Sequence, residues 1–219
     1  MKGLLIKDYY LLKKQGRFLL TVFIIALIVI MLNKQGSSFA VSYLTLTSAF
    51  LSLSTISYDE YDNGNSFLFT LPFKRRTYVY EKYLLGFIMG GSVWLLSTVL
   101  SFLHDYFITP SLQIMEWWIS YSNIMTIFLF FFAIFVPLHL KFGSDKGRVV
   151  SAILFGIVFA VFYVVSKIKS AVGIDFKAFL PSLPIQNLGF ISGMLFVLSL
   201  IALSISIGIS QTIIKQKEF

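Results

Sequence analysis

The stretch SYDEYDNGNSFLFTLPFKRRTYVYEKYLLG, residues 57–86, holds four acidic and four basic residues between two apolar runs. Those runs, residues 39–56 and 83–103, carry no charge at all. Each approaches the ~20 residues that a helix needs to cross ~30 Å of hydrocarbon. The charged stretch is therefore expected to be a structured loop at a membrane surface, joining two transmembrane helices.

The composition extends this interpretation to the whole chain. Of 219 residues, 57% are hydrophobic and only 13% are charged, whereas soluble domains carry about 25% charged residues. Backbone polar groups must be satisfied internally within a bilayer, so the apolar runs are expected to be helices. We predict an all-α membrane protein with six transmembrane helices, at residues 18–32, 39–56, 83–103, 123–140, 149–166 and 188–210.

The basic residues predict the orientation. Fourteen of the 18 Lys and Arg residues fall on the side that holds both termini, which the positive-inside rule places in the cytoplasm. The net charge of +8 reflects this bias and contact with anionic lipid rather than nucleic-acid binding. We therefore expect a multi-pass protein of the cell membrane. The four basic residues on the other side are Lys34, Lys167, Lys169 and Lys177.

The N-terminal segment, residues 1–17, has a helical pattern of its own. Leu4, Leu5, Tyr9 and Leu12 recur at helical spacing. This pattern predicts an amphipathic helix lying on the inner membrane surface. The alternative is a plain basic flank to the first span.

The outer segment at residues 167–187 differs from the other loops. Its central part, residues 171–184, is apolar but too short to span a bilayer. Short helices at the outer interface would suit it.

The residues for most catalytic and metal chemistry are missing. The chain has no cysteine and no P-loop motif, and His104 and His139 are expected at opposite membrane surfaces. The segment after Asp59 resembles a calcium loop, but Tyr61 stands at a ligand position. The spans lack ionisable residues near their centres, which argues against a secondary transporter and an intramembrane protease. We expect no catalytic residue, no metal and no cofactor in this chain.

Within the opening stretch, acidic residues end one helix and Pro72 is expected in the first turn of the next. On that helix Phe73, Thr77, Tyr80 and Leu84 would share one face. Two interpretations remain open here. The segment is either a lipid-bound connector or a helix that docks a cytosolic subunit, with aromatic residues filling a groove and basic residues setting the register.

Two stretches carry a family resemblance: MKGLLIKDYYLLKKQ at residues 1–15 and SFLFTLPFKRRTYVYEKYLLG at residues 66–86. They resemble the permease subunits of ABC-2-type ABC transporters. In particular they are similar to the short six-helix permeases of Gram-positive bacteria that act on peptide antibiotics, lantibiotics and phenol-soluble modulin toxins. The positions that match the stretch common in the family are Leu71, Pro72, Arg75, Val79, Lys82, Tyr83 and Leu84.

The resemblance implies a single permease domain over residues 1–219, with ATP hydrolysis performed by a partner. Two permease chains, alike or different, would pair with two copies of an ATPase that binds ATP and magnesium. Residues 1–17 would be the connecting helix, 57–83 the cytoplasmic coupling loop, and 167–187 the outer loop. The residues expected to contact the ATPase are Phe69, Leu71, Pro72, Phe73, Lys74, Arg75, Arg76 and Tyr80.

Small residues on the spans have two interpretations. Thr45, Ser48, Ser52 and Thr55 form a stripe on the second span, which either packs against other helices or faces a second chain and lines a substrate path. GxxxG motifs begin at Gly86 and at Gly189 and predict close helix packing.

The function predicted from the sequence is ATP-driven export of hydrophobic or amphipathic peptides, either toxins or antimicrobial peptides, across the cytoplasmic membrane. The alternative is an immunity or scaffold protein that binds a peptide without transporting it.

Overall fold

The computed structural model describes residues 2–32, 36–61, 64–108, 114–172 and 188–217, and within these ranges the regular elements are all α-helices. This agrees with the all-α fold expected from the apolar runs. The helices are α1 (Lys2–Lys14), α2 (Gly16–Leu32), α3 (Gly36–Glu60), α4 (Gly64–Leu68), α5 (Arg75–Ile108), α6 (Ile114–Val172) and α8 (Leu188–Gln216).

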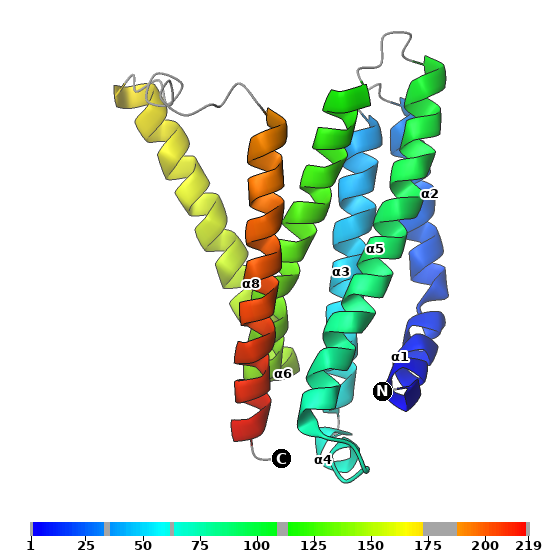
Figure 1. The fold of residues 1–219 in the computed structure, drawn as a ribbon, viewed down its shortest axis with the longest axis vertical. Coiled ribbons are helices and arrows are strands. Elements are labelled where there is room, and N and C mark those ends of the chain that lie inside the picture. Colours follow the sequence, from blue (N-terminus) through cyan, green and yellow to red (C-terminus); the bar gives the residue numbers. More distant parts are fainter. Residues whose placement is uncertain (1, 33–35, 62–63, 109–113, 173–187, 218–219) are drawn as a thin grey trace.

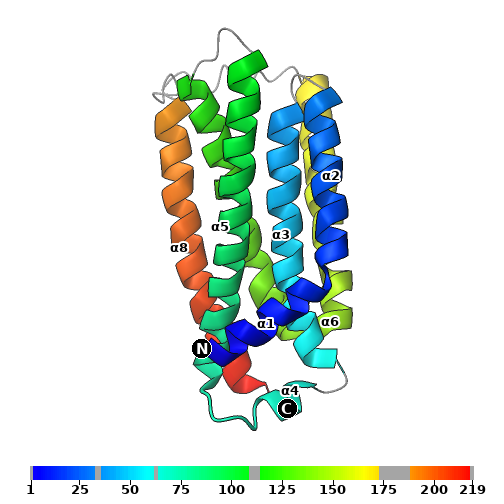
Figure 2. The same ribbon diagram turned by 90° about the vertical axis from the view of Figure 1, so that its right-hand side faces the viewer.

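The long helices run roughly along the long axis of the molecule, with α3 near the centre of the bundle (Figure 1). Helix α3 packs against α2, α5 and α6, and α8 packs against α6 and α5. Helix α1 lies across one end of the bundle, where α4 and both ends of the chain are also found (Figure 2). This end is called the basal end below.

Four of the helical segments described here are long and apolar enough to cross a membrane: Ser37–Glu60, Arg75–Phe107, Ile114–Gly143 and Gly189–Gln216. The first and fifth expected spans correspond to shorter apolar helices, Gly16–Ile30 and Val149–Val161. The order of the apolar segments along the chain is therefore the expected one, and among the described residues two of these segments are shorter than the other four.

Helix α6 contains a reversal that the sequence pattern had suggested would be a loop. Two helical arms meet at Gly143, whose backbone has φ 77 and ψ −173. Only glycine adopts this conformation readily. A Cβ atom at Gly143 would also lie 2.5 Å from both carboxylate oxygens of Glu60. The second arm leans away from α8 toward the far end of the bundle (Figure 1).

Aromatic side chains fill the contact between α5 and α6. The ring of Phe132 occupies the space beside Gly86, where a Cβ atom would approach its Cζ to 1.9 Å. Phe128 occupies the corresponding space beside Gly90, at 2.1 Å. The first GxxxG motif therefore receives two phenylalanine rings, as expected of a packing motif. The second behaves differently, because a Cβ at Gly193 would have nothing within 4 Å.

The start of α5 corrects one expectation. The helix begins at Arg75 rather than at Pro72, and residues 69–74 form turns. The amides of Thr70 and Leu71 donate to the carbonyls of Phe67 and Leu68, and the amide of Phe73 to that of Leu71. Pro72 has no amide hydrogen to donate and restricts Leu71 before it. The expected interfacial helices of the outer loop lie mostly at residues 173–187, outside the described residues.

Candidate functional site

Three buried charged residues meet at the basal end, one each from α1, α3 and α5. The side chains of Asp8 and Lys82 are 0% and 1% exposed, and that of Asp59 is 4% exposed. The Lys82 ammonium donates to the Asp8 carboxylate, lies 2.7 Å from Asp59 Oδ2, and is 3.2 Å from Thr55 Oγ1. Buried charges are costly unless they are paired and hydrogen-bonded in this way. We call Lys7, Asp8, Asp59, Glu81 and Lys82 the basal ion cluster.

Further groups complete the cluster. Lys7, which is partly exposed, donates to Asp59, and the Tyr78 hydroxyl donates to Asp59 Oδ2 at 3.1 Å. Burial raises the pKa of the Asp8 carboxyl, but the positive charges of Lys82 and Lys7 outweigh this and hold its pKa below the ordinary value. Asp8 is therefore ionised at neutral pH and attracts both lysines.

Glu81 adds a third buried acid to the cluster. It is fully buried and lies 3.7 Å from the Lys82 ammonium, yet neither of its carboxylate oxygens has a hydrogen-bond partner among the described residues. The cluster thus contains three acids and two bases. Removing either base would leave buried carboxyl groups with less compensation, so the position of α1 depends on both lysines.

Several of the predicted coupling residues hold the loop together rather than facing outward. The Phe69 ring packs edge-on against Tyr78, with centroids 5.4 Å apart, and tilted against Phe73 at 5.8 Å. Phe69 and Phe73 also pack against the main hydrophobic core. Both rings therefore anchor the turns between α4 and α5.

Arg75 has a specific structural role. Its guanidinium donates to the backbone carbonyls of Ile214, Lys215 and Lys217, each at 3.0 Å. These carbonyls at the C-terminal end of α8 have few partners within their own helix. The Arg75 guanidinium also lies 5.8 Å from the centroid of the Phe69 ring. Arg75 thus ties the end of α8 to the loop that precedes α5.

A second tie runs from the C-terminal segment to α3 and α6. The Lys217 ammonium donates to Glu60 Oε1 at 3.1 Å and to the Leu140 carbonyl at 3.3 Å. Glu60 in turn lies against Gly143, where α6 reverses. The ends of α3, α6 and α8 are therefore connected at the basal end.

The remaining predicted coupling residues form an exposed edge. Leu71 is 41% exposed and Tyr80 is 46% exposed, and two aromatic residues outside the prediction, Tyr61 and Phe67, are more than 70% exposed. Both lie in or beside the short α4. The acidic neighbours of Tyr61 in the sequence were an available signal for it, whereas Phe67 lies between Ser66 and Leu68 and gave none. The exposed basal edge comprises Tyr61, Phe67, Leu71, Pro72, Lys74, Arg76 and Tyr80.

The small-residue stripe of α3 lies inside the single chain. Thr45, Ser48, Ser52 and Thr55 are all buried. Each hydroxyl donates to a carbonyl three or four residues earlier in α3, at 2.7 to 3.0 Å. In this conformation the stripe presents no surface to a second chain.

The opposite end of the bundle is held by a hydrogen-bond cluster on Asp105. Its carboxylate accepts from Ser37 of α3, from the Trp117 indole at 3.1 Å and from the Tyr121 hydroxyl at 3.3 Å, both of α6. His104 Nδ1 lies 3.2 Å from the same carboxylate. No group of His, Asp or Glu in the described part of the chain could hold a metal ion.

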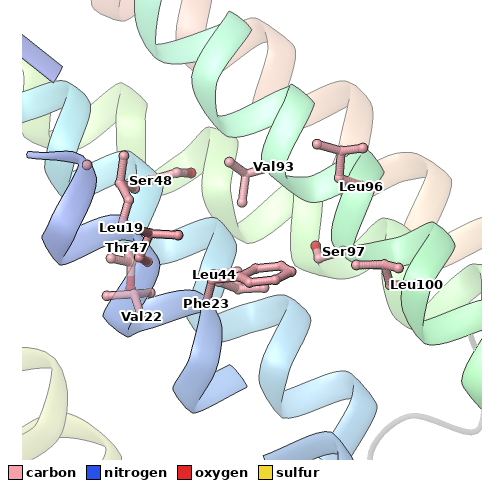
Figure 3. A pocket seen from close by; sticks show the side chains of 12 residues that line it. Leu19, Val22, Phe23, Leu44, Thr47, Ser48, Val93, Leu96, Ser97 and Leu100 are labelled. Carbon is pink, nitrogen blue, oxygen red and sulfur yellow. The ribbon is translucent and has the colours of Figure 1, made fainter. Parts of the chain in front are cut away.

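A lateral groove of about 490 Å³ opens between α2 and α5, with α3 as its floor (Figure 3). Its walls are apolar. They are formed mainly by Leu19, Val22 and Phe23 of α2 and by Val93, Leu96 and Leu100 of α5.

Comparison with known proteins gives one match. A family model described as ABC-2 family transporter protein matches residues 3–215, almost the whole chain. No curated protein and no solved structure matches.

Proposed function

Because this chain belongs to the ABC-2 family of transporter proteins, we propose that it exports hydrophobic or amphipathic peptides as the permease subunit of an ATP-driven complex. Membership of the family implies an integral membrane subunit that works with an ABC ATPase. The peptide cargo, a toxin or an antimicrobial peptide, and the outward direction rest on the resemblance of residues 66–86 to peptide-exporting permeases.

The proposed topology has six spans with the basal end in the cytoplasm. The basal end holds α1, α4 and both ends of the chain (Figure 2), and it carries most of the basic residues, in keeping with the positive-inside rule. The two short apolar helices then serve as the first and fifth spans in the cell membrane.

In this proposal two ATPase copies dock on two permease chains, and the exposed basal edge is the docking surface. Exposed aromatic and basic residues lie side by side there, which suits insertion into a groove on a partner with acidic neighbours. ATP and magnesium bind to the ATPase. The second permease chain is either another copy of this chain or a related one.

The observation that carries the proposal is the basal ion cluster. The helices on either side of the loop, α3 and α5, are joined to each other and to α1 through Lys82. A displacement of the loop by the ATPase is therefore transmitted to three helices at once. The stripe at Thr45 and Ser52 serves as a substrate path only if such a displacement separates α3 from its neighbours, because it is buried in this conformation.

The test is a pull-down from native membranes in a gentle detergent, with bound proteins identified by mass spectrometry. Arg76→Glu combined with Lys74→Glu changes the exposed edge, whereas Arg75 is unsuitable because it caps α8. Lys141→Glu, an exposed basic position on α6, is the matched control. A P-loop ATPase should co-purify with the wild type and the control and be lost from the double variant.

If no ATPase accompanies even the wild type, the immunity or scaffold alternative replaces the proposal. Transport in proteoliposomes gives a second decision. Export should require ATP and continue after the proton gradient is collapsed. Export that needs the gradient and not ATP would identify a secondary transporter.

A further inference from the structure

The lateral groove contains three hydroxyl side chains but offers no free hydrogen-bond donor to a ligand. Thr47, Ser48 and Ser97 line it. Their hydroxyls donate to the carbonyls of Tyr43, Thr45 and Trp94 in their own helices, at 2.7 to 3.1 Å. All other lining side chains are apolar, apart from Gly16, which has none. The groove therefore matches an occupant made only of hydrocarbon.

We propose that this groove binds an acyl chain of an anionic phospholipid from the leaflet on the basal side. A volume of about 490 Å³ falls within the usual range of ligand sites, ~300–1,000 Å³. An extended peptide segment is a poor occupant, because its backbone N–H and C=O groups would be buried without partners in the apolar groove. The proposal requires that the protein lies in a membrane, but it does not require that the protein exports peptides.

The position of the headgroup follows from the charges at the basal mouth of the groove. Gly16 lines the groove at the start of α2. Lys13 and Lys14 stand just before it, in the last turn of α1, and Arg17 follows it. All three bases are exposed, and none takes part in an ion pair among the described residues.

The charge is what makes the site selective. An acyl chain that enters the groove exchanges contacts with other lipid tails for contacts with protein side chains. Both surroundings are apolar, so binding gains van der Waals packing but little hydrophobic free energy. Lys and Arg near a membrane surface attract anionic headgroups. The groove then determines where the acyl chain lies, and the three bases favour a lipid with a negative headgroup.

The probe is phosphatidylglycerol that carries a photoactivatable group on its acyl chain. It is incorporated with the full-length chain into phosphatidylcholine vesicles, and crosslinked peptides are mapped by mass spectrometry. Crosslinks should concentrate at Phe23, Val93 and Leu96. Val93→Phe fills the groove and should abolish this enrichment, whereas Val99→Phe, on an exposed part of α5 outside the groove, should leave it unchanged.

The headgroup is tested separately. Arg17→Gln should lower the preference for phosphatidylglycerol over phosphatidylcholine with the same photoactivatable chain by about fivefold. Lys141→Gln, a basic residue away from the groove, should not lower it. This variant leaves the groove walls intact, so it tests the site even if Val93→Phe does not fold.

Two results would overturn the proposal. One is crosslinking spread evenly over the exposed helix faces and insensitive to Val93→Phe. The other is occupation of the groove by a second copy of the chain. Because the chain has no cysteine, an interchain disulfide formed in the membrane by Leu96→Cys alone would reveal that second copy.

Discussion

Replacing Lys82 by methionine removes the central base of the basal ion cluster while keeping a long apolar side chain of similar shape. Lys82 is fully buried and contacts both Asp8 and Asp59. In the variant, Lys7 is the only base left in the cluster for three acids. Lys7 is also the more exposed base, so solvent screens its charge more strongly.

The expected loss of stability is large. Removing one partner of a buried ion pair typically costs ~3–5 kcal/mol, because the remaining charge stays buried without compensation. Whole domains are stable by only ~5–15 kcal/mol. Lys82→Met should therefore remove a substantial part of the stability, and α1 should detach from α3 and α5 first, since Asp8 loses its main partner.

A double-mutant cycle separates two effects of Lys82: compensation of the buried acidic charges, and the ion pair that joins α1 to α5. Adding Asp8→Asn to Lys82→Met leaves two acids and one base in the cluster. The acids then exceed the bases by one, as they do in the wild type. Unfolding in mixed micelles should show that the double variant regains at least half of the lost free energy. Its substrate-stimulated ATP turnover in the assembled complex should stay low, because α1 is no longer bound to α5. A single variant that costs less than about 1 kcal/mol, or a double variant no more stable than the single, would refute this reasoning.

Three further predictions follow from the contacts. Gly143→Ala should destabilise the protein by ~1–3 kcal/mol, because φ 77 and the nearby Glu60 carboxylate both exclude a side chain. Gly156→Ala, whose added Cβ would meet nothing within 4 Å, should stabilise the protein slightly. Thermal unfolding compares the two variants. Gly86→Ala should cost ~1–3 kcal/mol by overpacking against Phe132, and Phe132→Leu should restore part of this in the same unfolding assay. For Asp8, whose pKa in the folded protein lies below its ordinary 3.8, the ion pairs contribute fully above that pH and are lost as the pH falls through the folded value. The stability difference between the wild type and Asp8→Asn should accordingly persist from neutral pH down to about 5 and shrink only in stronger acid.

Each of these predictions has an outcome that contradicts it. Equal effects of the alanine substitutions at positions 143 and 156 would mean that the reversal in α6 does not need glycine. An additive result for positions 86 and 132 would mean that the two residues do not share space. A stability difference for Asp8 that already disappears near neutral pH would mean that its carboxyl is not held ionised by the lysines.

Much of the architecture is readable from the sequence because apolar runs of span length have few alternatives to helix. The order of the apolar helices, the position of residues 57–86 at one end of the bundle and the packing role of Gly86 follow from hydropathy and small-residue spacing alone. A turn between the fourth and fifth expected spans was predicted, but not that it would be a tight reversal at Gly143. Basic residues around Gly143 indicated a loop, and the contact with Glu60 that closes the turn joins residues more than eighty positions apart.

The basal ion cluster was missed for a similar reason. Leu4, Asp8 and Leu12 form the buried stripe of α1, whereas the sequence pattern selected Tyr9, which is 61% exposed. The available signal for the cluster was Asp8 itself, an acid in the middle of the apolar stripe of α1. Its partner, Lys82, is 74 residues away, and no local pattern pairs the two.

The contacts at the basal end also change how the loop acts within the proposed exporter. On sequence grounds the loop acts on the two helices that flank it, α3 and α5. Arg75 also holds the end of α8, and Lys217 binds Glu60 and the Leu140 carbonyl. A push on the exposed basal edge is then shared between α1, α3 and α5 through Lys82 and between α6 and α8 through the C-terminal segment. Because the second tie is made largely by backbone carbonyls and a partly exposed lysine, it is the weaker of the two. Under load it should yield first, so that the C-terminal segment detaches from α3 and α6 while the basal ion cluster stays intact.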